Sequence, residues 1–428
     1  MPVPPPRAGR LLLLVPTQSY RAEDFLAAAR RLEVPVLVGT DRCHRIEDAF
    51  GPTEGLLSID YRRPEAAAQE IAREAAREPI SGVVPVDDGT AVIAALAAER
   101  LGLPWNPPVA ARRTANKLAQ RQALAAAGLP VPWFRAFPLA PGPEAAALEV
   151  PYPCVLKPLG LSGSRGVIRA DGPGAFRIAW RRIEAILAAA RSDRKAREGG
   201  EGSRLLVESF VPGAEVALEG LLRAGQLELL ALFDKPDPLD GPYFEETLYV
   251  TPSRHPAAVR DEIIRIVAAA AQALGLREGP VHAEARLGPD GPVVLEVAAR
   301  TIGGLCARAL RFGAGASLEE IVVAHAVGLP VDSIRRESRA SGVMMLPIPR
   351  RGVLHGVSGL EGARSVPGVE DVVVTAPEGR EVVPLPEGDA YLGFLFARGE
   401  TPDAVESSLR EAHRRLAFDI RAPLPTVR

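Results

Sequence analysis

The sequence predicts an α/β protein with more than one domain, and three observations support this prediction. Residues 11–110 alternate short apolar strands with helices, a pattern typical of a parallel, doubly wound sheet. Residues 282–298 form two alternating runs around a Gly-Pro-Asp-Gly-Pro turn, which predicts an antiparallel β-hairpin. The chain has 428 residues, which is too long for one core and fits two or three domains.

The N-terminal elements alternate regularly. Strands are expected at residues 11–15, 34–38 and 82–86, and helices at residues 21–32, 64–77 and 91–101. No G-x-G-x-x-G follows the first strand, so a dinucleotide-binding fingerprint is missing. Asp87 and Asp88 follow the third strand and open a helix, at the edge where such sheets bind ligands. Asp88 could cap this helix or contact a ligand, and the sequence leaves both roles open.

The remaining elements are separated by proline and glycine. A proline-rich stretch at residues 103–108 marks a boundary before a helix expected over residues 112–127. Loops are expected at residues 141–143 and 192–203. Residues 341–428 begin with a strand near 343–348, contain a helix near 401–415, and read as a third, small domain.

Composition excludes several classes of protein. The chain is 47% hydrophobic and 24% charged, which indicates a globular rather than a disordered protein. Its net charge of −2 argues against a broad nucleic-acid surface. The apolar run at residues 11–15 is too short to span a membrane and lacks the features of a secretory signal. Cys43, Cys154 and Cys306 lie far apart, which favours a reducing cytoplasm and no structural zinc.

Lysine is rare in this chain. The 51 basic residues include only four lysines, Lys117, Lys157, Lys195 and Lys235, and arginine fills the other positions. Codon bias is the simplest explanation for the preference for arginine. A lysine that remains nevertheless suits a phosphate oxygen in a tight site, because its ammonium is a compact charge on a flexible stem.

The predicted hairpin brings two glutamates together. Pairing Leu287 with Val293 gathers the apolar residues on one face and places Glu284 directly opposite Glu296 on the other. Two carboxylates about 5 Å apart repel each other unless a cation lies between them. Mg²⁺ is commonly held by one or two carboxylates, so a metal site is one interpretation. A solvated pair, or a glutamate paired with Arg286 or Arg300, is the other.

Two further segments suggest nucleotide contacts. A strand ending at Lys157 leads into a loop with Ser162, Gly163, Ser164 and Gly166, whose N–H and hydroxyl groups could cover phosphates. This loop is not a Walker A motif, because no Gly-Lys-Ser/Thr ends it and no helix follows. Residues 205–219 predict a strand whose edge could meet an adenine, followed by a carboxylate for the ribose. An ordinary hairpin is the alternative for both segments.

Taken together and in this order, these segments resemble the ATP-grasp superfamily. The matching motifs are the sequence around Lys117, the strand with Lys157, the loop at residues 162–166, residues 207–213, Glu284, and residues 295–304. Residues 234–253 are similar to the subgroup that contains L-amino-acid ligases and carnosine-synthase-like enzymes. The resemblance implies an N-terminal Rossmann-like domain (residues 1–110), an ATP-grasp domain (111–335, with a lid at about 131–213) and a small C-terminal α+β lobe (336–428) that completes the ligase core.

The resemblance also implies a role for each matched residue. ATP would be bound by Lys117, Lys157, Ser162, Gly163, Ser164, Gly166, Glu208, Ser209, Phe210, Val211 and Glu215. Mg²⁺, or alternatively Mn²⁺, would be held by Glu284 and Glu296. Catalysis would involve Arg300, Gly303, Gly304 and Lys235, with Glu246 near the acceptor or the γ-phosphate. The general base is not identified; His282 is a candidate, although a supporting or packing role fits it better.

One position departs from the family pattern. Many relatives have a metal-binding Asn two residues after the second glutamate, and Ala298 stands there in this chain. Because Arg300 is retained, the expectation is a cytoplasmic ligase that joins a small-molecule carboxylate, such as an amino acid, to an amine through an acyl phosphate. No nucleic-acid or membrane partner is expected, and a homodimer fits because relatives are often dimers. The alternatives are a carboxylase-like or purine-pathway ligase using formate or bicarbonate, and a nucleotide-binding protein without ligase activity.

Overall fold

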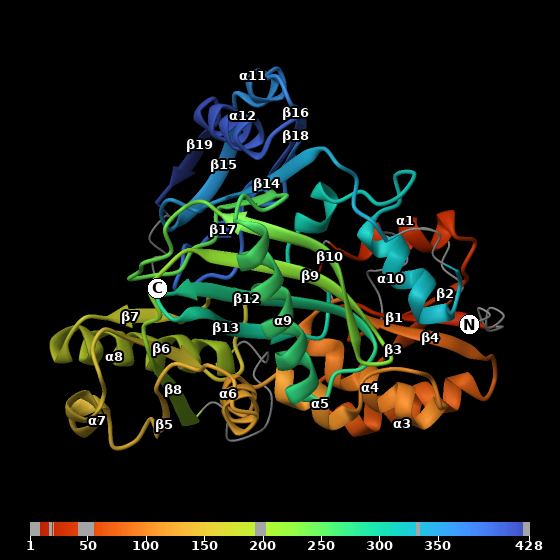
Figure 1. The fold of residues 1–428 in the computed structure, drawn as a ribbon, viewed down its shortest axis with the longest axis horizontal. Coiled ribbons are helices and arrows are strands. Elements are labelled where there is room, and N and C mark those ends of the chain that lie inside the picture. The colour runs from red at the N-terminus through yellow and green to blue at the C-terminus, as the bar shows by residue number, and fades with distance from the viewer. Residues whose placement is uncertain are drawn as a thin grey trace, which may run out of the picture.

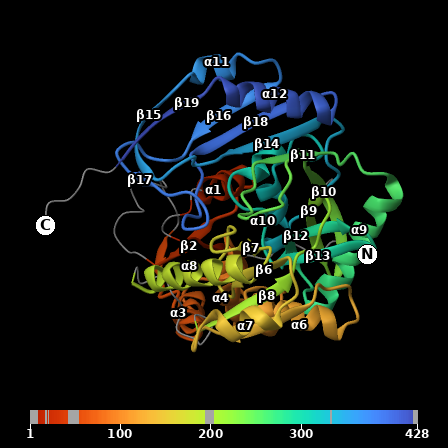
Figure 2. The ribbon, with the colours of Figure 1, turned by 90° about the vertical axis from the view of Figure 1, so that its left-hand side faces the viewer.

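The computed structural model describes residues 9–16, 19, 21–41, 55–192, 203–330 and 334–422. Most of the loop predicted at residues 192–203, with Lys195, and also Cys43 lie outside the described residues. Figures 1 and 2 show three groups of elements around one large sheet. The N-terminal group lies beside a four-stranded lid, and the C-terminal elements lie at the far end of the large sheet.

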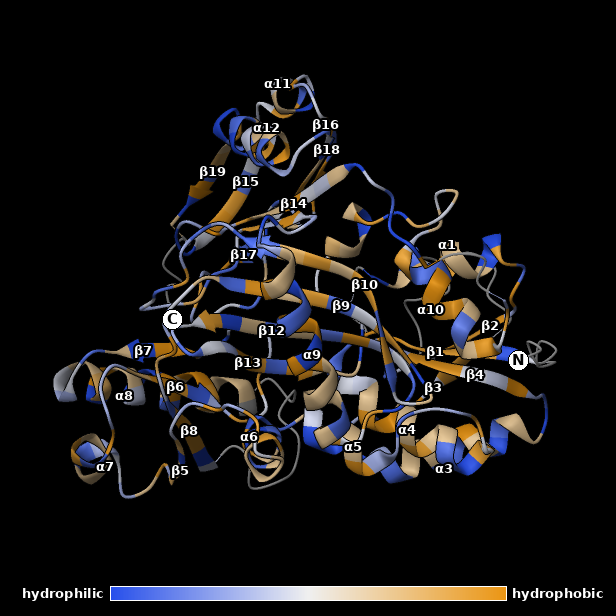
Figure 3. Cartoon of the chain, in the orientation of Figure 1, coloured by the Kyte–Doolittle hydropathy of each residue, from blue (hydrophilic) through white to orange (hydrophobic). Residues whose placement is uncertain are grey.

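The N-terminal group is a parallel sheet with the strand order β3-β2-β1-β4, as the alternating pattern predicts. Its elements are β1 (Arg10–Leu14), α1 (Ala22–Arg31), β2 (Val36–Thr40), β3 (Leu56–Ser58), α3 (Pro64–Ala75), β4 (Ile80–Pro85) and α4 (Asp88–Leu101). All five residues of β1 are buried, because helices cover both faces of the sheet. Figure 3 shows the resulting apolar strands beside the polar outer residues of α3. The sequence did not predict β3.

The single helix predicted over residues 112–127 is wrong. Two helices, α5 (Pro108–Thr114) and α6 (Lys117–Ala126), occupy this stretch. Asn116 between them is extended, and its side-chain oxygen accepts a hydrogen bond from the N–H of Ala119 at 3.0 Å. This cap starts a new helix, so that Lys117 becomes its first residue.

The lid is a four-stranded antiparallel sheet with the order β5-β8-β6-β7. Its elements are β5 (Phe134–Pro138), α7 (Pro143–Glu149), β6 (Cys154–Pro158), β7 (Ile168–Ala170), α8 (Pro173–Ser192) and β8 (Arg204–Ser209). The lid has a core of its own, in which Phe176 and Trp180 of α8 are fully buried against the sheet. A separate core allows the lid to behave as one packed unit.

The large sheet is antiparallel, with the order β13-β12-β9-β10-β11-β14-β18-β16. Its elements and their neighbours are β9 (Glu215–Arg223), β10 (Gln226–Lys235), β11 (Leu248–Thr251), α9 (Ala257–Leu274), β12 (Gly279–Gly288), β13 (Gly291–Ala298), η2 (Cys306–Ala309), α10 (Leu318–Val327), β14 (Ala340–Leu346), β16 (Val369–Val374), β18 (Gly393–Gly399) and α12 (Pro402–Arg414). The face under α9 packs against that helix, and the opposite face packs against α10 and the N-terminal group.

The C-terminal residues contribute to this sheet directly, since β14, β18 and β16 extend it. A second, three-stranded sheet has the order β17-β15-β19, with β15 (Gly352–Ser358), α11 (Leu360–Arg364), β17 (Glu381–Val382) and β19 (Ala417–Arg421). The shared sheet fixes the C-terminal elements to the strands that carry the glutamates. Among the described residues, no helix combines the length and the apolar character needed to cross a membrane.

Candidate active site

The two glutamates of the predicted hairpin do lie opposite each other. Glu284 of β12 pairs with Glu296 of β13, which confirms this pairing. The predicted pairing of Leu287 with Val293 is wrong, because Leu287 pairs with Pro292 and a β-bulge next to Glu284 restores the register. The bulge also changes which side chains are buried. Val294, rather than Val293 or Leu295, packs in the core with Val297.

The strand next to the hairpin, β9, brings further charged side chains to the glutamates. Strand β9 pairs with both β12 and β10, so that Glu215 lies opposite Lys235 on one side and Arg286 on the other. The ammonium of Lys235 donates to Glu215 at 2.7 Å and to Glu284 at 3.1 Å, and it also donates to Glu246. Lys235 is almost fully buried, with 3% of its side chain exposed.

The charged groups of this cluster change one another's pKa values. Burial alone lowers the pKa of Lys235, but Glu215, Glu246 and Glu284 outweigh it and raise that pKa well above its usual value. Burial, followed by the neighbouring Glu284, raises the pKa of Glu246 to about 7. The pKa of Glu284 is instead lowered, because Lys235 and His282 outweigh its burial. Lys235 thus holds Glu284 ionised.

His282 is held between two carboxylates. Its Nδ1 lies 2.5 Å from Glu219 and its Nε2 lies 3.5 Å from Glu284. Burial opposes the charge of the imidazole, but Glu219 and then Glu284 raise the pKa of His282 to about 9. A histidine that is already protonated at neutral pH is a poor base, which favours the supporting role. Glu219, which also accepts from the N–H of Ile302 at 3.1 Å, was not singled out in the sequence, although it shares the strand face of Glu215.

Arg300 meets the N-terminal group in this site. Its Nε and Nη2 donate to the two oxygens of Asp88 at 3.0 and 2.7 Å, and its Nη1 donates to the carbonyl of Thr301 at 2.9 Å. The question about the start of α4 is therefore resolved. Asp87 is the cap, because its side chain accepts from the N–H of Thr90, and Asp88 reaches across to the arginine.

The turn after Arg300 places its two glycines differently. Gly304 has φ of +60°, and a Cβ there would lie 2.8 Å from the ring of Phe394. No atom lies within 4 Å of the position that a Cβ would take on Gly303. Gly304 is therefore required by the fold, whereas Gly303 leaves an open approach to the backbone.

Three of the residues predicted to bind ATP, Glu208, Lys157 and Lys117, form ion pairs with other residues of the protein. Glu208, which is 2% exposed, lies 2.6 Å from both Arg121 and Lys157. Burial opposes its charge, but Arg121 and then Lys157 lower the pKa of Glu208 to about 2. Lys117 donates to the carbonyl of Leu161 at 2.6 Å and lies 4.0 Å from Glu296. This lysine therefore connects the glycine-rich loop to the glutamate pair.

The structure does not have the free strand edge that the sequence predicted for an adenine. Strand β8 lies between β5 and β6, so it is not an edge, and its end at Ser209 accepts from the N–H of Trp133 at 3.1 Å. The N–H of Phe210 donates to the carbonyl of Pro153 at 2.9 Å. The carbonyl of Val211 and the carboxylate of Glu215 both accept from Arg286, at 2.9 and 2.8 Å. In residues 209–211 and 215, the polar groups named here therefore form hydrogen bonds within the protein.

The glycine-rich loop lies against the C-terminal elements. Gly163, Ser164 and Gly166 all have positive φ, and the N–H of Gly166 donates to the carbonyl of Pro386 at 2.9 Å. Arg165 lies 3.8 Å from Asp389. Lid and C-terminal elements are thus in contact on one side of the site.

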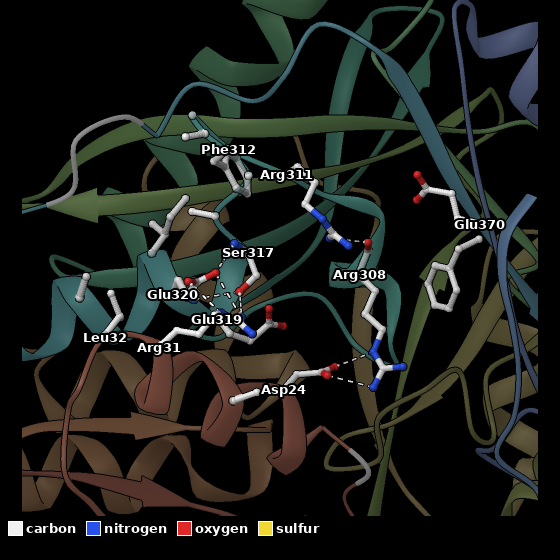
Figure 4. Close-up of a pocket in the computed structure, with 18 of the residues that line it drawn as sticks. Asp24, Arg31, Leu32, Arg308, Arg311, Phe312, Ser317, Glu319, Glu320 and Glu370 are labelled. Atoms are coloured by element: carbon white, nitrogen blue, oxygen red, sulfur yellow. Dashed lines mark hydrogen bonds and ion pairs between the residues drawn. The ribbon is translucent and has the colours of Figure 1, made fainter. Parts of the chain in front are cut away.

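A cavity of about 1140 Å³ is lined by residues of α1, of α10 and of β16, away from the glutamate pair. Asp24 and Arg308 are among its lining residues, and Figure 4 shows them paired. Nε and Nη2 of Arg308 donate to the two oxygens of Asp24, both at 2.9 Å. None of the predicted site residues lines this cavity. It is separate from the glutamate pair, and the chemistry described above does not involve it.

Known proteins resemble the chain along most of its length. Family models match in chain order: an ATP-grasp N-terminal domain at residues 26–105, an ATP-grasp domain at residues 150–309, and L-amino acid ligase C-terminal domain 2 at residues 344–421. An uncharacterized protein of Sinorhizobium fredii is 26% identical over 96% of this chain and 83% of its own length. Carnosine synthase 1 of Gallus gallus is 30% identical over 82% of this chain, which spans only 40% of that relative.

Solved structures agree on the fold. The crystal structure of an L-amino acid ligase from Bacillus licheniformis superposes with a TM-score of 0.79 and 24% identity, over 97% of this chain and 100% of that chain. A carboxyaminoimidazole ribonucleotide synthase of Aspergillus clavatus, complexed with ATP, superposes with a TM-score of 0.71 and 16% identity, over 96% and 99% of the two chains. The chain therefore contains ATP-grasp N-terminal and core domains and an L-amino acid ligase C-terminal domain, has the ATP-grasp fold, and is similar to L-amino acid ligases and carnosine synthases.

Proposed function

We propose that the chain is an ATP-dependent carboxylate–amine ligase that joins an amino acid to an amine or to a second amino acid. The observation that carries the proposal is the placement of Glu284 opposite Glu296, with Lys117 4.0 Å from Glu296. Carboxylates and an ammonium arranged in this way suit the phosphates of ATP and their divalent ions. Relatives named as L-amino acid ligase, carnosine synthase and D-alanine–D-alanine ligase support the class of reaction.

The residues present fit a magnesium site. Glu284 is ionised and partly exposed, Glu296 faces it across the hairpin, and both offer the oxygen ligands that Mg²⁺ prefers. When bound, Mg²⁺ or Mn²⁺ would neutralise phosphate charge as the phosphoryl group is transferred. Ala298 lies opposite His282 and offers no ligand atom, so the two glutamates are the ligands that this hairpin supplies.

In the first step, an oxygen of the substrate carboxylate attacks the γ-phosphorus of ATP, and ADP leaves. This step brings anions together, so cations must surround it. Lys117 of α6 contacts the lid loop at Leu161, Lys157 lies on lid strand β6, and Lys235 lies within the glutamate cluster. The product is an acyl phosphate, which the lid would protect from water.

In the second step, a neutral amine attacks the acyl carbon, the C–N bond forms, and the bond to phosphate breaks; the nitrogen gives up one proton, which balances as hydrogen phosphate. Negative charge develops on the acyl oxygen as the amine adds. Arg300 precedes the glycine turn and Gly303 lies in it with open space beside its backbone, and donors of this kind stabilise an oxyanion.

Release of ADP and phosphate from Mg²⁺-ATP across a panel of amino acids, singly and in pairs, tests the proposal. Release that depends on one amino acid or pair, together with the expected amide, supports a ligase. Glu296→Gln should abolish this release while thermal unfolding stays close to that of the unchanged chain, because Glu296 is partly exposed and an amide fills the same space. Wild-type rates in this variant would contradict the metal assignment.

Two other functions remain candidates. Formate or bicarbonate in place of the amino acid would indicate the carboxylase-like or purine-pathway type of ligase, and both belong in the same panel. Ala298 favours a nucleotide-binding protein without turnover, since it removes a ligand atom from the metal site. Tight ATP binding without release under any of these conditions would support that function.

A further inference from the structure

The ion pair between Arg300 and Asp88 joins two parts of the molecule at the proposed reaction centre. Arg300 follows β13, and Asp88 is the first residue of α4 in the N-terminal group. The two contacts of 3.0 and 2.7 Å are parallel, a geometry that gives strong and directional bonds. The side chain of Asp88 keeps 27% of its exposure, and that of Arg300 keeps 13%.

In the proposed reaction Arg300 also stabilises the oxyanion. Its Nε and Nη2 face Asp88, and its Nη1 faces the carbonyl of Thr301. A developing oxyanion or a phosphate that approaches this guanidinium competes with Asp88 for the same donors. If Arg300 turned toward such an anion, the carboxylate of Asp88 would be able to accept a hydrogen bond from the N–H of a neutral amine in the site.

We propose that Asp88 is the residue that binds the amino group of the incoming amine substrate. This inference rests on the proposed ligase function. The pair presents a guanidinium and a carboxylate side by side, which complements an anionic acyl group at Arg300 and an amino group at Asp88. The N-terminal group thereby selects acceptors with a basic primary amine, of which an α-amino acid is the simplest class.

The other carboxylates near the site have charged partners or a proposed metal. Glu296 is the proposed metal ligand opposite Glu284. Glu215, Glu246 and Glu284 surround Lys235, and Glu219 is held by His282 and the N–H of Ile302. Glu208 is 2% exposed between two cations. Asp87 caps α4. Asp88 differs because its main partner is itself the arginine that the reaction recruits.

Asp88 is also ionised at neutral pH, as an amine-binding group must be. Burial by itself raises the pKa of this carboxyl, but Arg300, with smaller contributions from Lys117 and His282, lowers it below the usual value. The negative charge needed to hold an amino group is therefore present before the substrate arrives.

The test compares two nucleophiles in the Asp88→Asn variant. Hydroxylamine is small and uncharged near neutral pH, so it intercepts an acyl phosphate without needing a carboxylate. With the amino-acid pair found for the wild-type chain, we expect the KM for the amine to rise about tenfold or more, as is typical when a bond to a charged group is lost. Hydroxamate formation and the KM for ATP should stay within about twofold of wild type, a difference too small to mark a lost charged contact. Asp88→Glu should restore part of the affinity for the amine.

Asp24→Asn is the matched control. Asp24 forms a pair of the same kind with Arg308, with two contacts of 2.9 Å, and it also joins the N-terminal group to the segment after Arg300. This pair lines the cavity between α1 and α10, away from the glutamates (Figure 4). The control should leave the KM for the amine unchanged, whatever it does to stability.

Each outcome bears on one idea. If Asp88 only positions Arg300, hydroxamate and amide formation fall together in Asp88→Asn, and the inference is wrong. An unchanged KM for the amine overturns it as well. Absence of any substrate-dependent release of ADP from the wild-type chain would instead contradict the proposed function, so the two failures are distinguishable.

Discussion

Lys235 is the residue on which the charge balance of the site depends. Three carboxylates, from Glu215, Glu246 and Glu284, lie within 4.8 Å of one another and share its ammonium. Removing one partner of a buried ionic cluster leaves an uncompensated charge, and this usually costs about 3–5 kcal/mol. The rarity of lysine pointed to this position, but the identity of its partners depends on strand register that sequence alone does not give.

Lys235→Met should therefore destabilise the chain and make its stability depend on divalent ions. In chelator, the midpoint of thermal unfolding should fall, because three carboxylates repel one another without the ammonium. Added Mg²⁺ or Mn²⁺ should recover more of this loss than it adds to the wild-type chain, because the carboxylates become a divalent site. Arg121→Met, which removes a buried cation from the single carboxylate of Glu208, is the control. Equal gains in both variants would contradict the prediction.

Glu208 provides a prediction about pH. Its pKa is lowered to about 2, against 4.5 for an unperturbed glutamate, so the folded state favours the ionised form. This stabilisation is complete above pH 4.5 and is lost as the pH falls toward 2. By linkage it contributes about 3 kcal/mol at pH 7 and about 2 kcal/mol at pH 3.5. The difference in unfolding free energy between wild type and Glu208→Gln should therefore become smaller as the pH falls from 7 to about 3.5. A difference that grows on acidification would contradict the lowered pKa of Glu208.

At the scale of elements, the two glycines of the turn after β13 are expected to have different roles, Gly304 in folding and Gly303 in binding. Gly304 has positive φ and lies against Phe394, whereas Gly303 has open space beside it. Gly304→Ala should lower the unfolding free energy by about 1–2 kcal/mol for the left-handed backbone, plus the cost of moving the ring. Gly303→Ala should unfold at nearly the wild-type temperature but weaken turnover if substrate approaches this backbone. Equal thermal losses in both variants would contradict this distinction.

The success of sequence reasoning also varied from element to element. Periodicity placed the N-terminal strands and helices, because buried parallel strands and alanine-rich helices carry strong patterns. It missed the break at Asn116, where one side-chain cap divides an apparently continuous helix. It also missed the bulge at Glu284, because hydrophobic alternation assumes a regular register and carries no signal for one extra residue. Asp88 could not be assigned, since its partner Arg300 lies 212 residues away.

At the scale of the whole molecule, the contact between lid and C-terminal elements closes one side of the site. Arg182 of α8 contacts Glu387 at 2.5 and 2.9 Å, and its guanidinium lies 4.9 Å from the ring centroid of Tyr243. The neighbouring N–H of Gly166 donates to Pro386. Both side chains of the ion pair are 38% exposed, so the pair adds little to global stability. Its effect should fall on closure of the lid.

Arg182→Ala should therefore uncouple ATP consumption from amide formation. A lid that opens more often admits water to the acyl phosphate, and hydrolysis then competes with the amine. We expect the amount of ADP released per amide formed to rise by about twofold or more, while thermal unfolding changes little. Arg177→Ala is the control, because Arg177 also lies on α8 but pairs with Glu144 inside the lid, at 2.6 Å. An unchanged ratio in Arg182→Ala, or the same rise in both variants, would mean that this contact does not exclude water.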